Sequence, residues 1–187
     1  MKKGICKFRI AVIVLLLSSG TFLSLRSYGQ PVMGILPVST NVNSMVLNEQ
    51  QWQSLSIQMQ DLLVSQMKET GTIRKLSREH ILLLLKELPS PDPENLTDEA
   101  FKIISKRENL NYLVRCTVES IRVENRNVLM PVRVVIIDGS TGKKFWEKSS
   151  AITRLISSSL LSEHLLLNEV FKPAISDLMP EIKILNF

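Results

Sequence analysis

The sequence predicts an α/β fold: a mixed sheet of about five strands with three to four helices packed on it, and a three-strand meander in the C-terminal half. Short apolar runs alternate with amphipathic helical periods in the first half. In the second half, β-branched runs are separated by two polar, turn-forming sequences. An order of strand, helix, strand, helix, helix, three strands and helix is typical of a sheet covered by helices.

The first strand is expected at Val32–Val38, and the polar stretch Ser39–Asn48 reads as a loop. The range Glu49–Met67 has apolar residues at helical spacing, which predicts an amphipathic helix. These residues are Trp52, Leu55, Met59, Leu62, Leu63 and Met67. Gly71 is expected to end this helix as a left-handed cap, before a second strand at Thr72–Leu76.

Two shorter helices should follow. Ser77 is a suitable N-cap for a helix over Arg78–Leu88, which has a dense apolar block from Ile81 to Leu85. Three prolines, Pro89, Pro91 and Pro93, forbid regular structure after it. Thr97 then caps a helix over Asp98–Glu108, whose first two acidic residues suit the helix dipole.

The second half is predicted to be mainly β. The range Tyr112–Val123 reads as a half-buried strand, and the turn Glu124–Asn127 joins it in a hairpin to Val128–Ile137. Its inner face holds Tyr112, Val114, Cys116 and Val118, which alternate with Arg115, Thr117 and Glu119. Pro131 cannot donate a ladder hydrogen bond, so the second strand needs a bulge or an unpaired side there.

A turn at Asp138–Gly142 leads into the third strand of the meander, Lys143–Thr153. Ser157–Ser159 precede a last helix over Leu160–Leu178, which Pro173 should kink or divide. A short apolar tail, Glu181–Phe187, ends the chain.

The N-terminus has the features of a secretory signal peptide. Four basic residues and no acidic residue lie within Met1–Arg9, and Ile10–Leu17 is wholly apolar. Ser27 and Gly29 are small enough for a signal peptidase, so we expect residues 1–29 to be removed and residues 30–187 to form a single globular domain in the periplasm. The alternative is an uncleaved inner-membrane anchor, although the apolar run is shorter than the roughly 20 residues that span a bilayer. No cysteine follows the apolar run, so the sequence has no lipobox.

The charge balance argues against nucleic-acid binding. Residues 1–29 hold five of the 23 basic residues and none of the 18 acidic residues, so the rest of the chain carries equal numbers of each. Binding to nucleic acid needs a basic face that neutralises phosphates. We therefore expect no nucleic-acid partner, and contact with a membrane only through partners once the signal is cleaved.

Isolated residues that could carry chemistry have plainer structural explanations. His80 and His164 lack the spacing of a metal site, and the expected mature chain keeps only Cys116, which should be a buried thiol on the inner face of its strand. Ser157–Ser159 lack a nucleophile elbow and read as loop and cap.

The acidic cluster Asp92, Glu94, Asp98 and Glu99 fits a helix start better than a calcium loop. Asn95–Thr97 is a glycosylation sequon, which has meaning only in a eukaryotic secretory pathway. We predict no catalytic, cofactor-binding or metal-binding residues, no cofactor and no enzyme activity.

Four segments together resemble a known family: Gly34–Val38 (GILPV), Gly71–Arg74 (GTIR), Leu110–Val118 (LNYLVRCTV) and Val132–Trp146 (VRVVIIDGSTGKKFW). The chain resembles the bacterial envelope proteins that include the curli secretion channel subunit CsgG, the penicillin-binding-protein activator LpoB and the N-terminal domain of TolB. Cys116 stands where that family has a glycine, and 187 residues leave no room for the insertions that form the transmembrane strands of the channel.

The resemblance implies an envelope compartment and a non-enzymatic role. We expect a periplasmic protein–protein interaction module that binds an envelope protein and serves envelope assembly, secretion or cell-wall synthesis. A small-ligand binder or hydrolase of the envelope is one alternative. A self-assembling ring subunit, and hence a homo-oligomer, is another.

Overall fold

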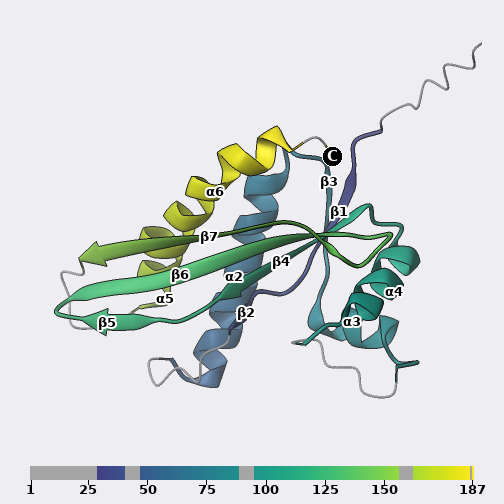
Figure 1. Ribbon diagram of the computed structural model, residues 1–187. Helices are drawn as coiled ribbons and strands as arrows, with labels where there is room; N and C mark the ends of the chain where they lie inside the picture. The colour runs from purple at the N-terminus through teal and green to yellow at the C-terminus, as the bar shows by residue number, and fades with distance from the viewer. Residues whose placement is uncertain (1–28, 41–46, 89–94, 156–161, 186) are drawn as a thin grey trace, which may run out of the picture.

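The computed structural model describes residues 29–40, 47–88, 95–155, 162–185 and 187, and its elements form a sheet with helices on both faces (Figure 1). The strands are β1 (Val32–Ile35), β2 (Ser39–Thr40), β3 (Thr72–Lys75), β4 (Tyr112–Val118), β5 (Arg122–Glu124), β6 (Asn127–Asp138) and β7 (Lys144–Leu155). The helices are α2 (Glu49–Met67), α3 (Arg78–Leu84), α4 (Asp98–Glu108), α5 (Glu163–Leu165), a π-helix η1 (Leu166–Phe171) and α6 (Lys172–Ile184).

The sheet is mixed, as the sequence predicts. β1 pairs in parallel with β3 on one side and with β4 on the other, and β4 pairs antiparallel with β6. β5 continues along β6 beyond the end of β4, and β7 pairs antiparallel with the other side of β6. The prediction of a C-terminal meander is therefore confirmed, and among the described strands β2, β3, β5 and β7 each pair with a single neighbour.

Two hydrophobic clusters lie on opposite faces of the sheet. The larger cluster packs α2, η1 and α6 against the face that carries Val114, Cys116 and Val134. The smaller cluster packs α3 and α4 against Leu36, Leu113 and Ile137 at one end of the other face. Figure 1 shows that the β5–β6–β7 arm extends well beyond α3 and α4. Much of the second face of the meander therefore has no helix over it among the described elements.

Helix starts agree closely with the predictions because their caps are local. Asn48 forms a capping box with Gln51 at the start of α2, and the side chains of Ser77 and Thr97 accept backbone N–H groups of α3 and α4. The helix over Arg78–Leu88 is shorter than predicted, because α3 passes into turns after Leu84.

The expected end of the first strand and the expected cap of the first helix need correction. β1 ends at Ile35, before Pro37, and the predicted loop over Ser39–Asn48 begins with a strand, β2, which pairs with Thr117–Val118 of β4. Residues 41–46 lie outside the described residues. Gly71 is not a left-handed cap, because Lys68 ends α2 and the only glycine with positive φ in the described chain is Gly142. A side chain at position 71 would instead overlap the carbonyl oxygen of Pro31.

The predicted strand Tyr112–Val123 is divided into β4 and β5, and Pro131 is the physical reason. The Glu119 N–H donates to the Pro131 carbonyl oxygen at 2.9 Å, so the nitrogen of Pro131, which has no hydrogen, faces β4. The ladder with β6 stops there and resumes at Arg122. The expected unpaired side at Pro131 is confirmed. The prediction of a half-buried strand is wrong, because Leu113 and Thr117 are buried as well.

The last helix differs most from its prediction. Ser162, not Ser157–Ser159, caps it; those serines lie outside the described residues. Pro173 divides the helix, as expected, and the division takes the form of the π-helix η1 before it. The helix continues through Pro180 to Ile184 instead of ending at Leu178. Pro180 and Ser176 are both exposed, so the carbonyl group that lacks a donor lies next to water. Phe187 then packs on Tyr112 and Phe145, with ring centroids 5.0 and 6.0 Å away.

Candidate functional site

The uncovered face of the meander carries a groove of about 300 Å³ beside the start of α4. The strand register places Arg115, Val135 and Glu147 in one row across β4, β6 and β7, and Thr117 and Arg133 in the next. These five residues form the floor. Asp98 and Phe101 of α4, with Leu96 before it, form one wall, and Gly142 and Lys144 close the end near the turn.

Arg133 lies at the centre of the polar floor. Its Nε donates to the Glu119 carboxylate at 2.6 Å, and its Nη1 lies 3.6 Å from the Glu147 carboxylate. Lys144 forms a further ion pair with Glu147. These contacts lower the pKa of Glu147, mainly through the hydrogen bond from Lys144 and against some desolvation. The floor is therefore a network of paired charges that is only part-buried.

The turn between β6 and β7 fixes the end of the groove. The Asp138 carboxylate accepts the backbone N–H groups of Ser140 and Thr141 at 2.9 and 2.8 Å, and both hydroxyl groups of these residues. Gly142 has a φ of 70°, and a Cβ there would overlap the backbone of Asp98. The predicted turn over Asp138–Gly142 is confirmed, and it packs directly against the first turn of α4.

The structure does not bring together the residues that the sequence analysis considered for catalysis or metal binding. His80 Nε2 lies 2.8 Å from the Glu108 carboxylate and links α3 to α4, whereas His164 lies on α5. Burial of Cys116 raises the pKa of its thiol. Asp98 and Glu99 lie in the first turn of α4, and Asp92, Glu94 and Ser157–Ser159 fall outside the described residues. Among the residues that the structure does describe, no three His, Cys, Asp or Glu side chains form a group that could hold a metal ion.

Sequence reasoning missed Arg133 and its two carboxylate partners. The alternation of Arg115, Thr117 and Glu119 with apolar residues did indicate a polar face on β4. Pairing Glu119 with Arg133 and Glu147 requires the register of three strands, which no local signal supplies. None of the described helices is long and apolar enough to cross a membrane.

Comparisons with known proteins find relatives among solved structures only. No family model matches the chain, and no curated protein matches it either. The lipoprotein GNA1162 from Neisseria meningitidis aligns over 81% of this chain and 97% of its own, with 11% identity and a TM-score of 0.52. The PelC dodecamer from Paraburkholderia phytofirmans aligns over 79% and 86%, with 13% identity and a TM-score of 0.47. The LpoB C-terminal domain from Escherichia coli aligns over 77% and 94%, with 13% identity and a TM-score of 0.47.

These similarities show the fold alone, because the sequence identities of 11% and 13% are far below those of close relatives. The resemblance in fold that the sequence motifs predict is confirmed at that level by a solved lipoprotein. The chain shares the fold of the Neisseria meningitidis lipoprotein GNA1162.

Proposed function

We propose that the protein is a non-enzymatic interaction module of the periplasm that binds another envelope protein after residues 1–29 are removed. The observation that carries this proposal is the uncovered face of the meander with Arg133 at its centre. A flat sheet face with an ordered, mutually paired charge network is suited to contact with a protein surface. Such networks add specificity and steer association more than they add affinity.

The ion pairing of the charged groups also argues against hydrolysis as the role of this groove. Arg133 and Lys144 are already bound to carboxylates, and both carboxylates, Glu119 and Glu147, are bound to cations. A general base or acid needs a pKa near the working pH, whereas the pKa of Glu147 is lowered. Glu147, the carboxylate on the floor of the groove, is therefore not poised for proton transfer near neutral pH.

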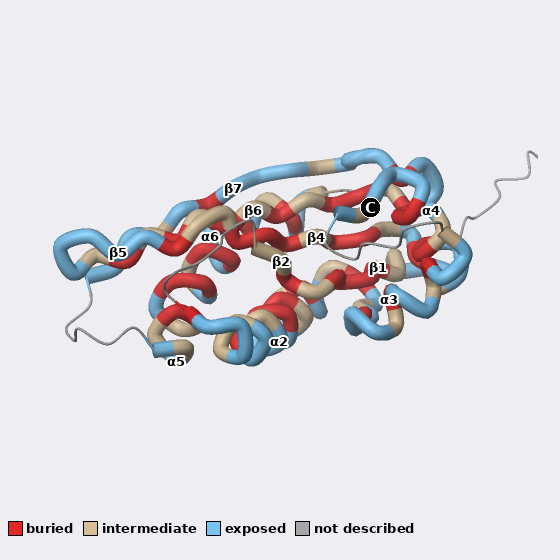
Figure 2. Tube along the Cα trace, turned by 90° about the horizontal axis from the view of Figure 1, so that it is seen from below, coloured by how far each residue is buried: buried red, intermediate tan, exposed pale blue. Residues whose placement is uncertain are grey.

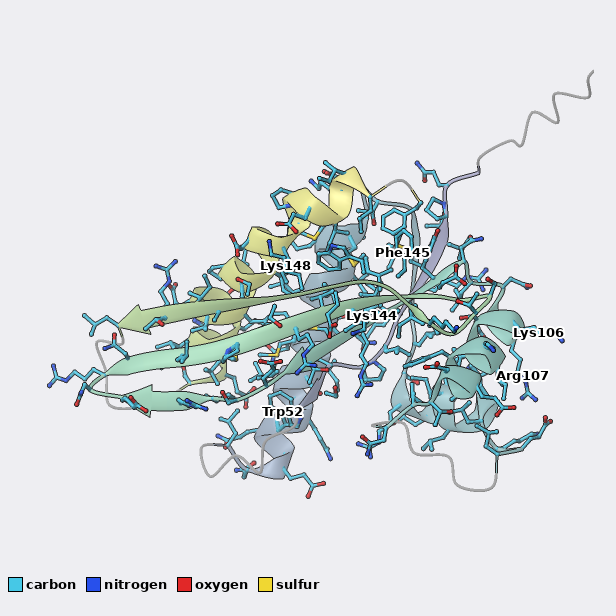
Figure 3. All side chains as sticks on the ribbon, in the orientation of Figure 1. Trp52, Lys106, Arg107, Lys144, Phe145 and Lys148 are labelled. Carbon is cyan, nitrogen blue, oxygen red and sulfur yellow. The ribbon has the colours of Figure 1, made fainter. Side chains whose placement is uncertain are left out.

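The test is an in-cell crosslink and pull-down of the tagged mature protein from the envelope fraction. We expect one recurrent envelope partner, whose recovery falls sharply with Arg133→Glu, because the reversed charge would face Glu119 and Glu147. Lys106→Glu is the matched control: Lys106 is exposed on α4, and Figure 3 shows it directed away from the meander. Equal recovery with both variants would exclude this face as the docking surface, and no recurrent partner at all would contradict the proposed function.

A small-ligand binder is a second candidate, supported by the convergence of Arg115, Thr117, Arg133 and Lys144 on one groove of about 300 Å³. That volume lies at the low end of known ligand sites. A screen of envelope metabolites by thermal shift, with Arg133→Glu as the comparison, would support this candidate if a compound stabilised only the unmodified protein. Self-assembly into a ring is tested separately by light scattering, and a monomer at high concentration would remove it.

A further inference from the structure

We propose that the outer edge of β7, from Ser149 to Leu155, accepts an extended segment of another envelope protein as an added strand. This inference rests on the proposed function and assigns it a second contact surface, the strand edge beside the groove. β7 is paired on one side only: its partner is β6, and no other described strand lies next to it. Figure 2 shows β7 exposed along most of its length, in contrast with the buried centres of β4 and β6.

The register shows which backbone groups of β7 face outward. The Pro131 carbonyl accepts from Glu119, so the polar backbone groups of Pro131 face β4. Ala151 is the cross-strand partner of Pro131, and in an antiparallel ladder such a pair points its polar groups away from each other. The outward N–H and C=O groups of β7 therefore belong to every second residue, which gives Ser149, Ala151, Thr153 and Leu155. Only another extended backbone presents donors and acceptors at the matching spacing.

The usual protections of an edge strand are missing from this segment. Natural edge strands are guarded by prolines, bulges and charged side chains. The bulge of β7 lies outside the segment, opposite Ile136 and Ile137, and Ser149–Leu155 contains no proline. The charged side chains in and next to the segment are bound to the helices. Lys148, just before the segment, pairs with Glu181 of α6, and the Nε of Arg154 donates to the Glu169 carbonyl oxygen.

These same contacts hold β7 in place. Together with the hydrogen bond of 2.8 Å from Ser150 Oγ to Asp177, they tie the strand to η1 and α6 at three points along its length. Figure 1 shows α6 running alongside β7. An edge that is already ordered loses less conformational entropy when a second strand pairs with it.

The surroundings define the chemistry of the partner segment. On one face of β7 the side chains are small and uncharged, at Ser149, Ala151 and Thr153. The other face of β7 is next to α6. Three apolar residues of α6 lie at helical spacing beside the residues that contact β7: Pro173, Pro180 and Ile184. The side chain of Ile184 is 76% exposed. The site therefore fits an extended, uncharged segment with β-branched or other apolar side chains towards α6.

Antiparallel pairing of β7 with the β7 of a second copy would crowd the two α6 helices. Edge-to-edge pairing would place two β7 strands about 4.8 Å apart. Each copy would bring its own α6, tied to its own β7, to the same side of the joined sheet. Packed helices need about 8–10 Å between their axes. A single strand from a different protein meets no such conflict.

The first test uses hydrogen exchange of the purified mature protein. The amides of Ser149, Ala151 and Thr153 should exchange at least about tenfold faster than those of Lys148, Ser150 and Ile152, which bond to β6, because only a protected amide must wait for local opening. Equal protection of both sets would mean that the edge is already covered, and the proposal would fail.

The second test places the photo-crosslinker p-benzoylphenylalanine at Thr153 of the full chain in cells, and separately at Ser149. Both positions should capture the same short segment of one partner. Ala151→Pro should reduce capture about tenfold, because it removes one outward donor without removing a bond to β6. Thr153→Pro, analysed with the crosslinker at Ser149, is a second variant in case the first unfolds. Asp98→Pro is unsuitable as a control, because Asp98 lines the groove and the substitution would alter it.

The outcomes separate this inference from the proposed function. Pull-down of a partner that depends on Arg133 but gives no adduct at Thr153 would overturn the added strand and leave the interaction module standing. An adduct that maps to this chain itself would replace the partner by a second copy and overturn the inference too. A synthetic peptide of the captured segment that slows exchange at Ser149, Ala151 and Thr153 would establish strand addition.

Discussion

The Nε atom of Arg154 lies 3.1 Å from the carbonyl oxygen of Glu169 and donates a hydrogen bond to it, joining β7 to the π-helix. An α-helix would direct the N–H of residue 173 at this oxygen. Residue 173 is a proline and has none. The strand thus supplies a donor in place of the N–H that the proline lacks, at the point where the helix changes its winding.

This relationship predicts that the two residues are energetically coupled. Arg154→Met should lower the free energy of unfolding by about 1 kcal/mol in the natural sequence. In a Pro173→Ala background the same change should cost less, because residue 173 regains an N–H. A double-mutant cycle by urea denaturation measures the difference, with Arg122→Met on exposed β5 as the control. Equal costs in both backgrounds would show that the contact does not compensate for the proline.

Gln60 is a buried polar side chain whose removal should be costly. Its Nε2 donates to the carbonyl oxygens of Ile35 and Leu76, both at 2.9 Å, at the ends of β1 and β3. Gln60→Met keeps the volume but removes this donor from both buried oxygens, of which that of Ile35 still accepts the Leu76 N–H, so unfolding should become easier by about 1–3 kcal/mol. Gln53→Met, at an exposed site on the same helix, should change stability by less than about 0.5 kcal/mol. Similar losses for both variants would contradict this account.

The turn at Asp138 should make stability depend on pH. Hydrogen bonds lower the pKa of Asp138, the largest effect coming from the Ser140 hydroxyl and further ones from Thr141 and the backbone, against some desolvation. A lowered pKa stabilises the fold above the ordinary value of 3.8, and this contribution is lost as the pH falls through the folded value.

Urea denaturation between pH 7 and pH 3 tests this dependence. Asp138→Asn should be less stable than the natural protein at neutral pH, and the gap should narrow as the solution becomes more acidic. Glu49→Gln, an exposed acidic residue at the start of α2, serves as the control. A gap that stays constant over the range would mean that the charge of Asp138 does not stabilise the turn.

Cys116 should be chemically inert in the folded protein. It is fully buried, and burial raises the pKa of its thiol, so almost no thiolate forms near neutral pH. We expect no measurable reaction with a disulfide reagent at pH 8 over hours, and prompt reaction in denaturant. Thr153→Cys adds an exposed thiol as the positive control. Fast labelling of Cys116 in the native protein would reveal frequent opening of the main core.

The sequence predicts best the features whose causes are local. The helices Glu49–Met67 and Asp98–Glu108 have the expected bounds because a side-chain cap and an apolar stripe define each of them. The break between β4 and β5 was missed, because it arises from Pro131 on the neighbouring strand. The extent of the last helix was also missed, because Pro173 and Pro180 are tolerated only through the π-turn and an exposed carbonyl.

The surface proposed for binding could be predicted only in part. A polar face on β4 follows from the alternation in its sequence, and any open sheet has exposed edges. Which strand forms the edge depends on the order in which strands pair. The pairing of Arg133 with Glu119 and Glu147 depends on the register of three strands, which tertiary contacts set.

The order of the strands also bears on how the chain folds. β1 lies inside the sheet between β3 and β4, and its Val32 meets Asn111 across 79 residues, whereas β4, β6 and β7 are close neighbours in sequence. Because distant contacts form slowly, the meander should nucleate folding and β1 should join late. The chain would then stay unfolded until its last third is synthesised. Pulsed hydrogen exchange, with early protection of β6 before β1, would reveal this order.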